Sequence, residues 1–199
     1  SAASDVYKRQ AKEIVQSGVL GDLIQVDAVF SYNNQADLEN IRNNSNMGGG
    51  GLPDIGVYTL GSVRFVTDQE PAAIRHVDIK YENGVDVWAL AAFDFPKFKF
   101  TSITSMRMAP RQEVTFQGTD GFIKLTAPFN PLVYDKAEII KRMNDGTEEV
   151  FSYPGVSQYV NQIEAFSDAV LNEKTYPCSL EFSQGTQAMI DSIFDFSST

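Results

Sequence analysis

The residues best suited to chemistry lie between Gly48 and Tyr58, where a run of glycines leads into a predicted helix. Pro53 fits the first turn of a helix, where its missing N–H costs nothing. Asp54 then lies at the positive end of that helix, and Tyr58 follows four residues later on the same face. A phenol and a carboxylate so spaced can share a site in which Tyr58 passes a proton to or from a substrate hydroxyl and Asp54 orients the substrate. The glycines are expected to let substrate or cofactor approach the backbone.

On spacing alone, two plainer explanations remain open for this segment. An aspartate in a first turn is often only favourable helix electrostatics. A tyrosine four residues later often serves packing alone.

Other residue types that support catalysis or metal binding occur singly. His76 is the only histidine, and it has no evident partners for a metal or a triad, so a structural role is favoured. Cys178 is the only cysteine and has no neighbouring motif that would make it a nucleophile. Arg107 and Arg111 bracket a turn and can meet an anionic group, although surface solvation is favoured. No group of Cys, His and carboxylate residues has metal-ligand spacing, so we predict no metal site.

Hydrophobic periodicity predicts the elements that position these residues. Helices are predicted where apolar residues recur at three- and four-residue spacing, namely over residues 5–18, 52–67, 158–172 and 181–196. Strands are predicted where apolar residues alternate or form short runs, namely over residues 22–32, 72–81, 85–95, 98–108, 113–118, 122–126, 132–134 and 148–153. Residues 33–51 form a polar loop, and the short turns between the later strands favour antiparallel hairpins.

Strands in a run, with helices before and after, predict an α+β fold with helices packed on one sheet face and residues 1–199 as a single domain. The other face is expected to carry Trp88, Leu90, Phe93 and Phe95, which indicates a subunit interface. No GxGxxG follows a strand and opens a helix, so the chain is not expected to bind a dinucleotide by itself.

Composition excludes several classes of partner. The formal net charge is −10, which disfavours nucleic acid because such binding draws on Lys and Arg. No apolar stretch approaches the roughly 20 residues that cross a bilayer, so no membrane partner is expected. A single cysteine rules out an internal disulfide, and we expect a reducing, cytoplasmic location.

The segment MGGGGLPDIGVYTLGSVRF (residues 47–65) resembles the GGGxLxDxGxYxL segment of the Gfo/Idh/MocA oxidoreductases, the glucose–fructose oxidoreductase and inositol dehydrogenase family. Four further segments resemble consecutive parts of that family's C-terminal domain: residues 6–30, 114–125, 159–172 and 179–194. The resemblance therefore covers nearly the whole chain.

This resemblance implies an open, largely antiparallel sheet whose free face mediates homo-oligomer contacts. It also implies that Asp54 and Tyr58 face the nicotinamide ring and the substrate, and that Arg42 contacts substrate or cofactor. Tyr159 and Gln162, at the start of a predicted helix, can line the same cleft, although packing or solvent exposure is favoured. A tyrosine at position 58 resembles the glucose–fructose oxidoreductase, xylose dehydrogenase and dihydrodiol dehydrogenase branches.

The family's Rossmann half and its Glu-Lys-Pro motif are absent from the sequence, so we expect a fragment. The resemblance implies the substrate-binding and oligomerisation domain of an NAD(P)-dependent oxidoreductase that acts on a sugar or polyol-like alcohol. Alone, the chain is expected to bind no cofactor and to be inactive. A non-enzymatic sugar-pathway regulator and an NAD-dependent glycosidase remain alternatives, and substrate identity, NAD versus NADP and reaction direction stay open.

Overall fold

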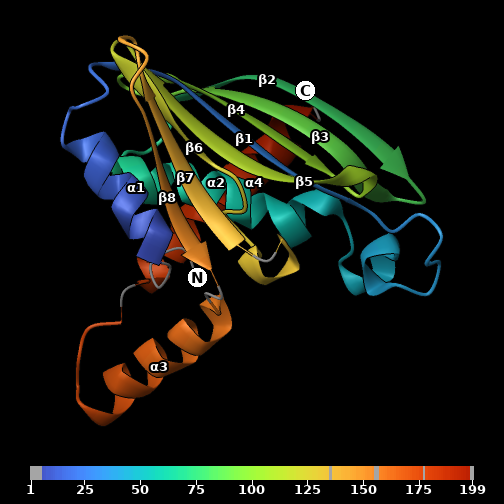
Figure 1. Cartoon of the computed structure of the whole chain (residues 1–199). Coiled ribbons are helices and arrows are strands. Elements are labelled where there is room, and N and C mark those ends of the chain that lie inside the picture. The colour runs from blue at the N-terminus through green and yellow to red at the C-terminus, as the bar shows by residue number, and fades with distance from the viewer. Residues whose placement is uncertain (1–5, 135, 155–156, 177, 198–199) are drawn as a thin grey trace.

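Within the residues that the computed structural model describes, 6–134, 136–154, 157–176 and 178–197, eight strands form one continuous sheet (Figure 1). Their order across the sheet is β2-β3-β4-β1-β5-β6-β7-β8, and every neighbouring pair is antiparallel except the parallel pair β1 and β4. The strands are β1 (Leu23–Asn33), β2 (Ala73–Glu82), β3 (Val85–Asp94), β4 (Lys99–Ser105), β5 (Arg107–Gly118), β6 (Gly121–Leu125), β7 (Lys136–Met143) and β8 (Glu148–Pro154). The predicted α+β class with an open, largely antiparallel sheet is confirmed.

Two strand assignments made from the sequence were wrong. Residues 132–134 belong to the 3-10 turn η5 (Pro131–Tyr134) and not to a strand. Pro131 favours this outcome, because proline has no N–H to donate to a strand ladder. Strand β7 was not predicted, because half of its residues are charged. These charges obscure the alternating pattern in which Ala137 and Ile139 are buried.

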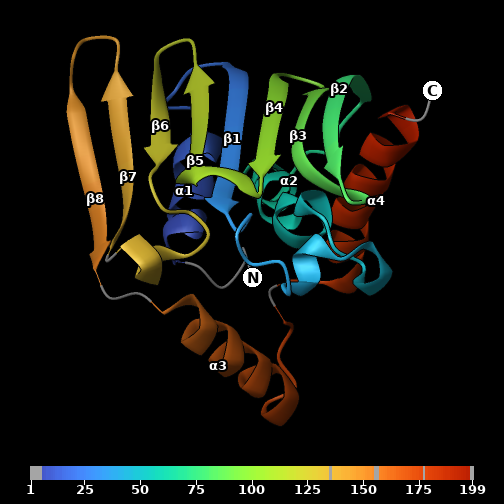
Figure 2. The same ribbon diagram turned by 90° about the vertical axis from the view of Figure 1, so that its right-hand side faces the viewer.

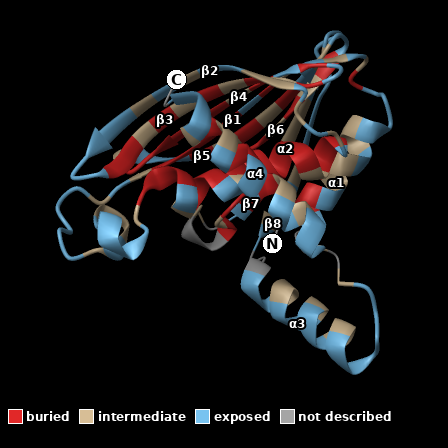
Figure 3. Cartoon of the chain, turned by 180° about the vertical axis from the view of Figure 1, so that it is seen from behind, coloured by how far each residue is buried: buried red, intermediate tan, exposed pale blue. Residues whose placement is uncertain are grey.

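The hydrophobic core lies between the sheet and three helices, α1 (Val6–Gln16), α2 (Val57–Thr67) and α4 (Leu180–Ser197) (Figure 2). Seen from behind, buried residues concentrate on the inner sides of these helices and on the sheet beneath them (Figure 3). Asp5, predicted to open the first helix, lies outside the described residues. Fully buried side chains from every layer meet in this core: Tyr7, Leu60, Phe100, Phe116, Ile123 and Ile190. Burial of each such side chain contributes roughly 1.5–3 kcal/mol.

Helix α3 (Gln158–Leu171) does not pack on the sheet as predicted, but projects away from it (Figures 1 and 2). Its predicted apolar positions exist, but they face outward: Ile163, Phe166 and Val170 are 66%, 59% and 62% exposed. The spacing of apolar residues therefore predicted the helix correctly but not the surface that it packs against. Such spacing indicates that one face of a helix is apolar, and it does not indicate which element contacts that face.

The free face of the sheet carries fewer aromatic side chains than expected. Phe93 and Phe95 are buried in the core under the helices, whereas Trp88 and Leu90 point to the free face. Successive residues of a strand point to opposite faces of the sheet, so the odd-numbered pair Phe93 and Phe95 cannot lie on the same face as the even-numbered pair Trp88 and Leu90. Trp88 lies under the ammonium group of Lys80, 5.2 Å from the ring centroid. Among the described residues, no helix is long and apolar enough to cross a membrane.

Candidate functional site

The segment that follows the glycines begins with one π-helical turn, η4 (Leu52–Gly56), and continues as α2. The sequence predicted a single α-helix here. Pro53 lies in the π turn, whose wider backbone ring is uncommon and occurs often at functional sites. Asp54 belongs to this turn and Tyr58 to the first turn of α2, so the irregular turn sets where the two side chains lie relative to one another.

Both carboxylate oxygens of Asp54 have protein partners. Oδ1 lies 2.8 Å from Nε of Arg42, and Oδ2 accepts a hydrogen bond of 2.8 Å from the hydroxyl of Tyr32 at the end of β1. Burial, reinforced by the hydrogen bond to Asp54 and by its charge, raises the pKa of the Tyr32 phenol. The hydrogen bond to Asp54 likewise raises the pKa of Arg42. Asp54 is thus suited to hold Arg42 and Tyr32 in place, and less suited to act as a free base.

The ring of Tyr58 is fixed by two aromatic neighbours. Its centroid lies 5.5 Å from that of Phe30 and 5.6 Å from that of Phe129, at tilted or edge-on angles that aromatic pairs prefer. Tyr58 is half-buried and lines the same hollow as Asp54. The phenol is therefore carried on a rigid base at the wall of that hollow.

This hollow, which we call the Asp54 hollow, has a volume of about 480 Å³ and opens beside the end of β1, η4 and the first half of β5. Its lining is dominated by phenols and side-chain amides: Tyr32, Tyr58, Tyr134, Tyr159, Asn34, Asn40, Gln112 and Asn130, together with Arg42, Asp54 and a few apolar or small residues.

Of the five site residues predicted from the sequence, the structure brings Asp54, Tyr58, Arg42 and Tyr159 to the Asp54 hollow. Gln162 lies elsewhere, in a separate hollow between α3 and residues 175–176 and 178–183. Residues three apart share a helix face, but α3 leads away from the sheet, so Gln162 lies almost one turn further from the hollow than Tyr159.

Tyr32, which contacts Asp54 directly, was not predicted as a site residue. The alternation over residues 22–32 placed it only in a predicted strand. A polar-tipped aromatic at the end of a strand is a weak signal of such a contact, because the partner is 22 residues away in the sequence.

The lining of the Asp54 hollow is rich in hydrogen-bonding groups and nearly neutral in charge. Arg42 is the cation among its lining residues, and Asp54 neutralises it. Asn34 lines the hollow, and its Nδ2 is buried without a hydrogen-bond partner among the described residues. This donor set fits a neutral polyhydroxyl compound better than a pyrophosphate, which needs several cations or a run of backbone N–H groups. The described residues contain no group of three or more His, Cys, Asp or Glu that could hold a metal.

The glycine run serves the packing of the chain on itself. A Cβ on Gly49 would lie 2.5 Å from the backbone oxygen of Arg42, and one on Gly50 would lie 2.2 Å from Oδ1 of Asp86. Around Gly48, by contrast, no atom lies within 4 Å of the added Cβ. We expected the glycines to admit substrate to the backbone. At Gly49 and Gly50 the structure gives a different reason for glycine, because a side chain at either position would overlap other atoms of the same chain.

Asp86 is a buried carboxylate beneath this run. It is 3% exposed, and its Oδ2 accepts a hydrogen bond of 2.6 Å from the N–H of Leu52. Burial raises the pKa of Asp86 to about 6, although hydrogen bonds from the N–H groups of Leu52 and Gly51 act in the opposite direction. The ionised form thus has a desolvation cost that these hydrogen bonds offset only in part.

The raised pKa of Asp86 predicts a specific pH dependence of stability. The folded state holds this proton up to about pH 6, whereas the unfolded chain releases it near 3.8. The free energy of unfolding is therefore expected to fall as pH rises through this window, by about 3 kcal/mol in total, and then to level off. Urea unfolding of the wild type and of Asp86→Asn between pH 4 and 7.5 measures the difference; equal slopes for the two proteins would contradict the prediction.

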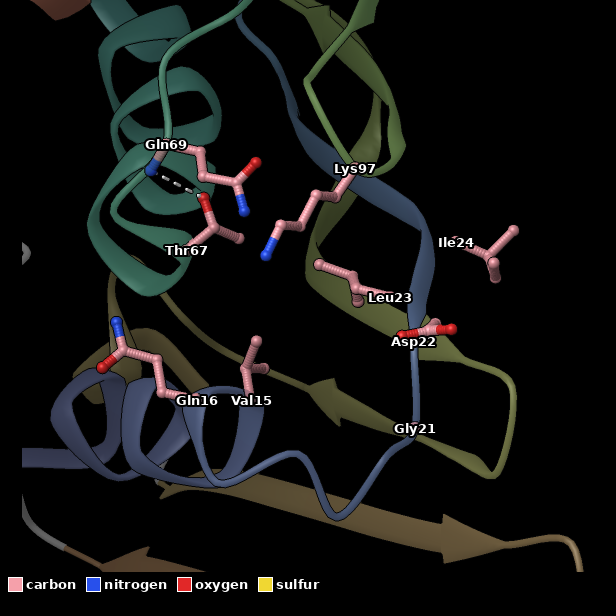
Figure 4. A pocket seen from close by; sticks show the side chains of 9 residues that line it. All are labelled: Val15, Gln16, Gly21, Asp22, Leu23, Ile24, Thr67, Gln69 and Lys97. Atoms are coloured by element: carbon pink, nitrogen blue, oxygen red, sulfur yellow. Dashed lines mark hydrogen bonds between the residues drawn. The ribbon is translucent and has the colours of Figure 1, made fainter.

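A second hollow lies at the opposite end of α2, between the end of α1, the start of β1 and the turn between β3 and β4 (Figure 4). Lys97 reaches into it from that turn, and the N–H of Gln69 donates to the hydroxyl of Thr67 on its wall. It contains none of the predicted site residues, and no carboxylate pairs with a phenol there. We therefore regard the Asp54 hollow as the candidate active site.

Comparison with known proteins gives a consistent result. A family model described as GFO/IDH/MocA C-terminal domain matches residues 8–124. The chain is 32% identical over 187 residues to the uncharacterized oxidoreductase ORF334 of Rhizobium meliloti, covering 91% of this chain and 56% of that protein. It is 23% identical over 197 residues to a D-xylose 1-dehydrogenase [NADP(+)] of Haloarcula marismortui, covering 92% and 51%. The chain thus spans about half the length of the curated relatives it matches.

Solved structures share the fold at low sequence identity. An aldose-aldose oxidoreductase from Caulobacter crescentus complexed with glycerol has a TM-score of 0.84 at 18% identity, over 98% of this chain and 59% of that one. KijD10, a 3-ketoreductase from Actinomadura kijaniata in complex with NADP, has a TM-score of 0.78 at 20% identity, over 98% and 58%.

Proposed function

Because the chain belongs to the GFO/IDH/MocA family through its C-terminal domain, we propose that it is the substrate-side and oligomerisation domain of an NAD(P)-dependent oxidoreductase acting on a sugar or polyol-like alcohol. The observation that carries this proposal is the Asp54 hollow, a neutral site of phenols and amides beside a tyrosine held on a rigid aromatic base. Relatives named as xylose dehydrogenases and a structural neighbour named as an aldose-aldose oxidoreductase support the substrate class.

In this proposal, each site residue has a distinct task. Tyr58 exchanges a proton with the oxygen that interconverts between hydroxyl and carbonyl, donating it in the direction of carbonyl reduction. Asp54 keeps Arg42 and Tyr32 oriented, and the Arg42 side chain, which is 41% exposed, hydrogen-bonds a further substrate oxygen. Tyr159 covers the hollow from α3. A nicotinamide dinucleotide supplies the hydride acceptor or donor when it is bound.

The chain alone is proposed to be inactive, because the lining of the hollow provides no cationic cluster for a dinucleotide. The outward apolar face of α3 supports the same conclusion. Side chains such as Ile163 and Phe166 are more than half exposed, as expected for a surface that contacts another domain of a longer protein.

The proposal is tested with the full-length product of the gene that encodes this chain. We expect it to reduce NAD or NADP with at least one aldose or polyol in a panel, measured by absorbance of the reduced nicotinamide, and we expect the 199-residue chain to show no turnover. Turnover of aryl glycosides without net cofactor consumption would indicate a glycosidase instead. Dinucleotide binding without turnover of any substrate would indicate a regulator.

We propose that the free face of the sheet forms a homo-oligomer contact. Its centre is apolar: Leu90 and Ile103 lie opposite one another on β3 and β4, and Val29 neighbours Ile103 on β1. These three alternate with core residues, so they point away from the helices.

A charge at the centre of this face is expected to dissociate the oligomer. Ile103→Lys should convert it to monomer because the lysine would be desolvated without a partner. Light scattering after gel filtration measures the molecular mass. Thr101→Lys, two residues nearer the start of β4, introduces the same charge away from the apolar centre and should have a smaller effect. A monomeric wild-type protein would contradict the proposed contact.

We infer a cytoplasmic location from the single cysteine, Cys178, which fits a reducing compartment. Fractionation of the source cells tests this, and recovery in a secreted fraction would contradict it.

A further inference from the structure

Asp86 lies outside the Asp54 hollow, yet it contacts the segment that builds the hollow. It is on β3, where the register with β2 shifts by one residue between Lys80 and Tyr81. Such a bulge redirects the neighbouring side chains of a strand. The carboxylate of Asp86 therefore points under the glycine run, where it accepts the N–H of Leu52 at 2.6 Å in a buried position.

Two glycines complete the fit around this carboxylate. Gly50 has a φ of +133°, a conformation that residues with a side chain rarely adopt, and its added Cβ would overlap Oδ1 of Asp86. The added Cβ of Gly51 would lie 3.2 Å from Oδ2. The backbone of residues 50–52 is thus wrapped closely around the carboxylate.

Residues 50–52, which Asp86 contacts, are connected to both Arg42 and Asp54, the ion pair of the Asp54 hollow. On one side, the N–H of Gly50 donates to the backbone oxygen of Arg42 at 3.0 Å. On the other side, Leu52 begins the π turn that carries Asp54. The side chains of Arg42 and Asp54 then meet at 2.8 Å.

We propose that Asp86 is a positioning residue of the site: by binding the backbone of residues 50–52 it fixes the π turn and, through it, the Asp54–Arg42 pair. The proposal rests on the proposed function in assigning Asp54 to the active site. A carboxylate is suited to this task because it accepts several N–H donors at once, whereas an asparagine of the same shape offers only one accepting oxygen. The first four N–H groups of a helix have no partner within it, and no side chain of the adjoining residues caps this one, so an acceptor at this point substitutes for a missing N-cap.

The test measures the Arg42–Asp54 contact directly in the 199-residue chain. The Nε–H of Arg42 is expected to give a protected NMR signal because Nε lies 2.8 Å from Oδ1 of Asp54 in an ion pair, and Asp54→Asn provides the reference for weakening of that contact. In Asp86→Asn we expect at least tenfold faster solvent exchange of this Nε–H, with signals of the distant strands unchanged. Asp94→Asn is the matched control, since it makes the same substitution at the other end of the same strand, where the side chain forms ion pairs with Arg75 and Lys99.

Protection of the Arg42 Nε–H equal to that of the wild type, in a folded Asp86→Asn chain, would overturn the proposal. If Asp86→Asn does not fold, Asp86→Ser is used instead, because its hydroxyl keeps one acceptor for Leu52 and leaves room for water. An intermediate exchange rate is then expected, and an unchanged rate would overturn the proposal. The readout needs no substrate, so its failure is distinguishable from failure of the proposed function, which only the activity of the full-length protein decides.

Discussion

Replacement of Tyr58 by phenylalanine is expected to lower kcat of the full-length protein by roughly 10²–10⁴-fold, the usual contribution of a positioned acid or base. The loss should fall on kcat and much less on KM, because the phenol is proposed to act on the proton that moves in the reaction. The fold should survive, since the ring contacts with Phe30 and Phe129 need no hydroxyl. Steady-state kinetics with the best substrate of the panel measure both constants.

Tyr81→Phe is the matched control for this experiment. Tyr81 lies on β2, is 53% exposed and does not line the Asp54 hollow, so its hydroxyl should be dispensable. Activity of Tyr58→Phe within twofold of the wild type would reject the role of Tyr58. If Asp54→Ala were also without effect, the Asp54 hollow itself would be excluded as the active site.

Replacement of Gly50 by alanine is expected to destabilise the chain by roughly 2–5 kcal/mol, which combines backbone strain with overpacking. Both causes act at this residue, because its φ is +133° and its added Cβ would lie 2.2 Å from Oδ1 of Asp86. Asp86 cannot move aside without losing its hydrogen bond to Leu52. Urea unfolding followed by circular dichroism measures the loss.

Gly48→Ala separates the two causes. Gly48 also has a positive φ, +70°, but its added Cβ meets no atom within 4 Å, so only strain of about 1–2 kcal/mol is expected. The steric part should also disappear in the double variant Gly50→Ala/Asp86→Ala, whose loss should be smaller than the two single losses combined. Strict additivity would show that the contact with Asp86 is not the cause.

The sequence alone determined the class of the fold and located the segment that carries the candidate site. Alternating and helical periodicities are local, so they located the helices and seven of the strands that the structure describes. The segment from Gly48 to Tyr58 stood out because glycine, proline, aspartate and tyrosine each have a local conformational or chemical reason for their place. Four of the five predicted site residues line one hollow, and their chemical roles remain proposals.

Only the tertiary structure decided what each of these residues contacts. Tyr32 and Asp86 reach the site from strands 22 and 34 residues away from their partners, and no local pattern encodes such distances. The outward face of α3 and the inward turn of Phe93 were misassigned for the same reason. Periodicity states that a face is apolar, whereas the register of the sheet and the order of its strands decide which layer that face meets. The glycines give the clearest case. The sequence indicates that side chains are disfavoured in this run, and the fold shows that at Gly49 and Gly50 the space a Cβ would occupy is filled by the backbone of Arg42 and by the carboxylate of Asp86.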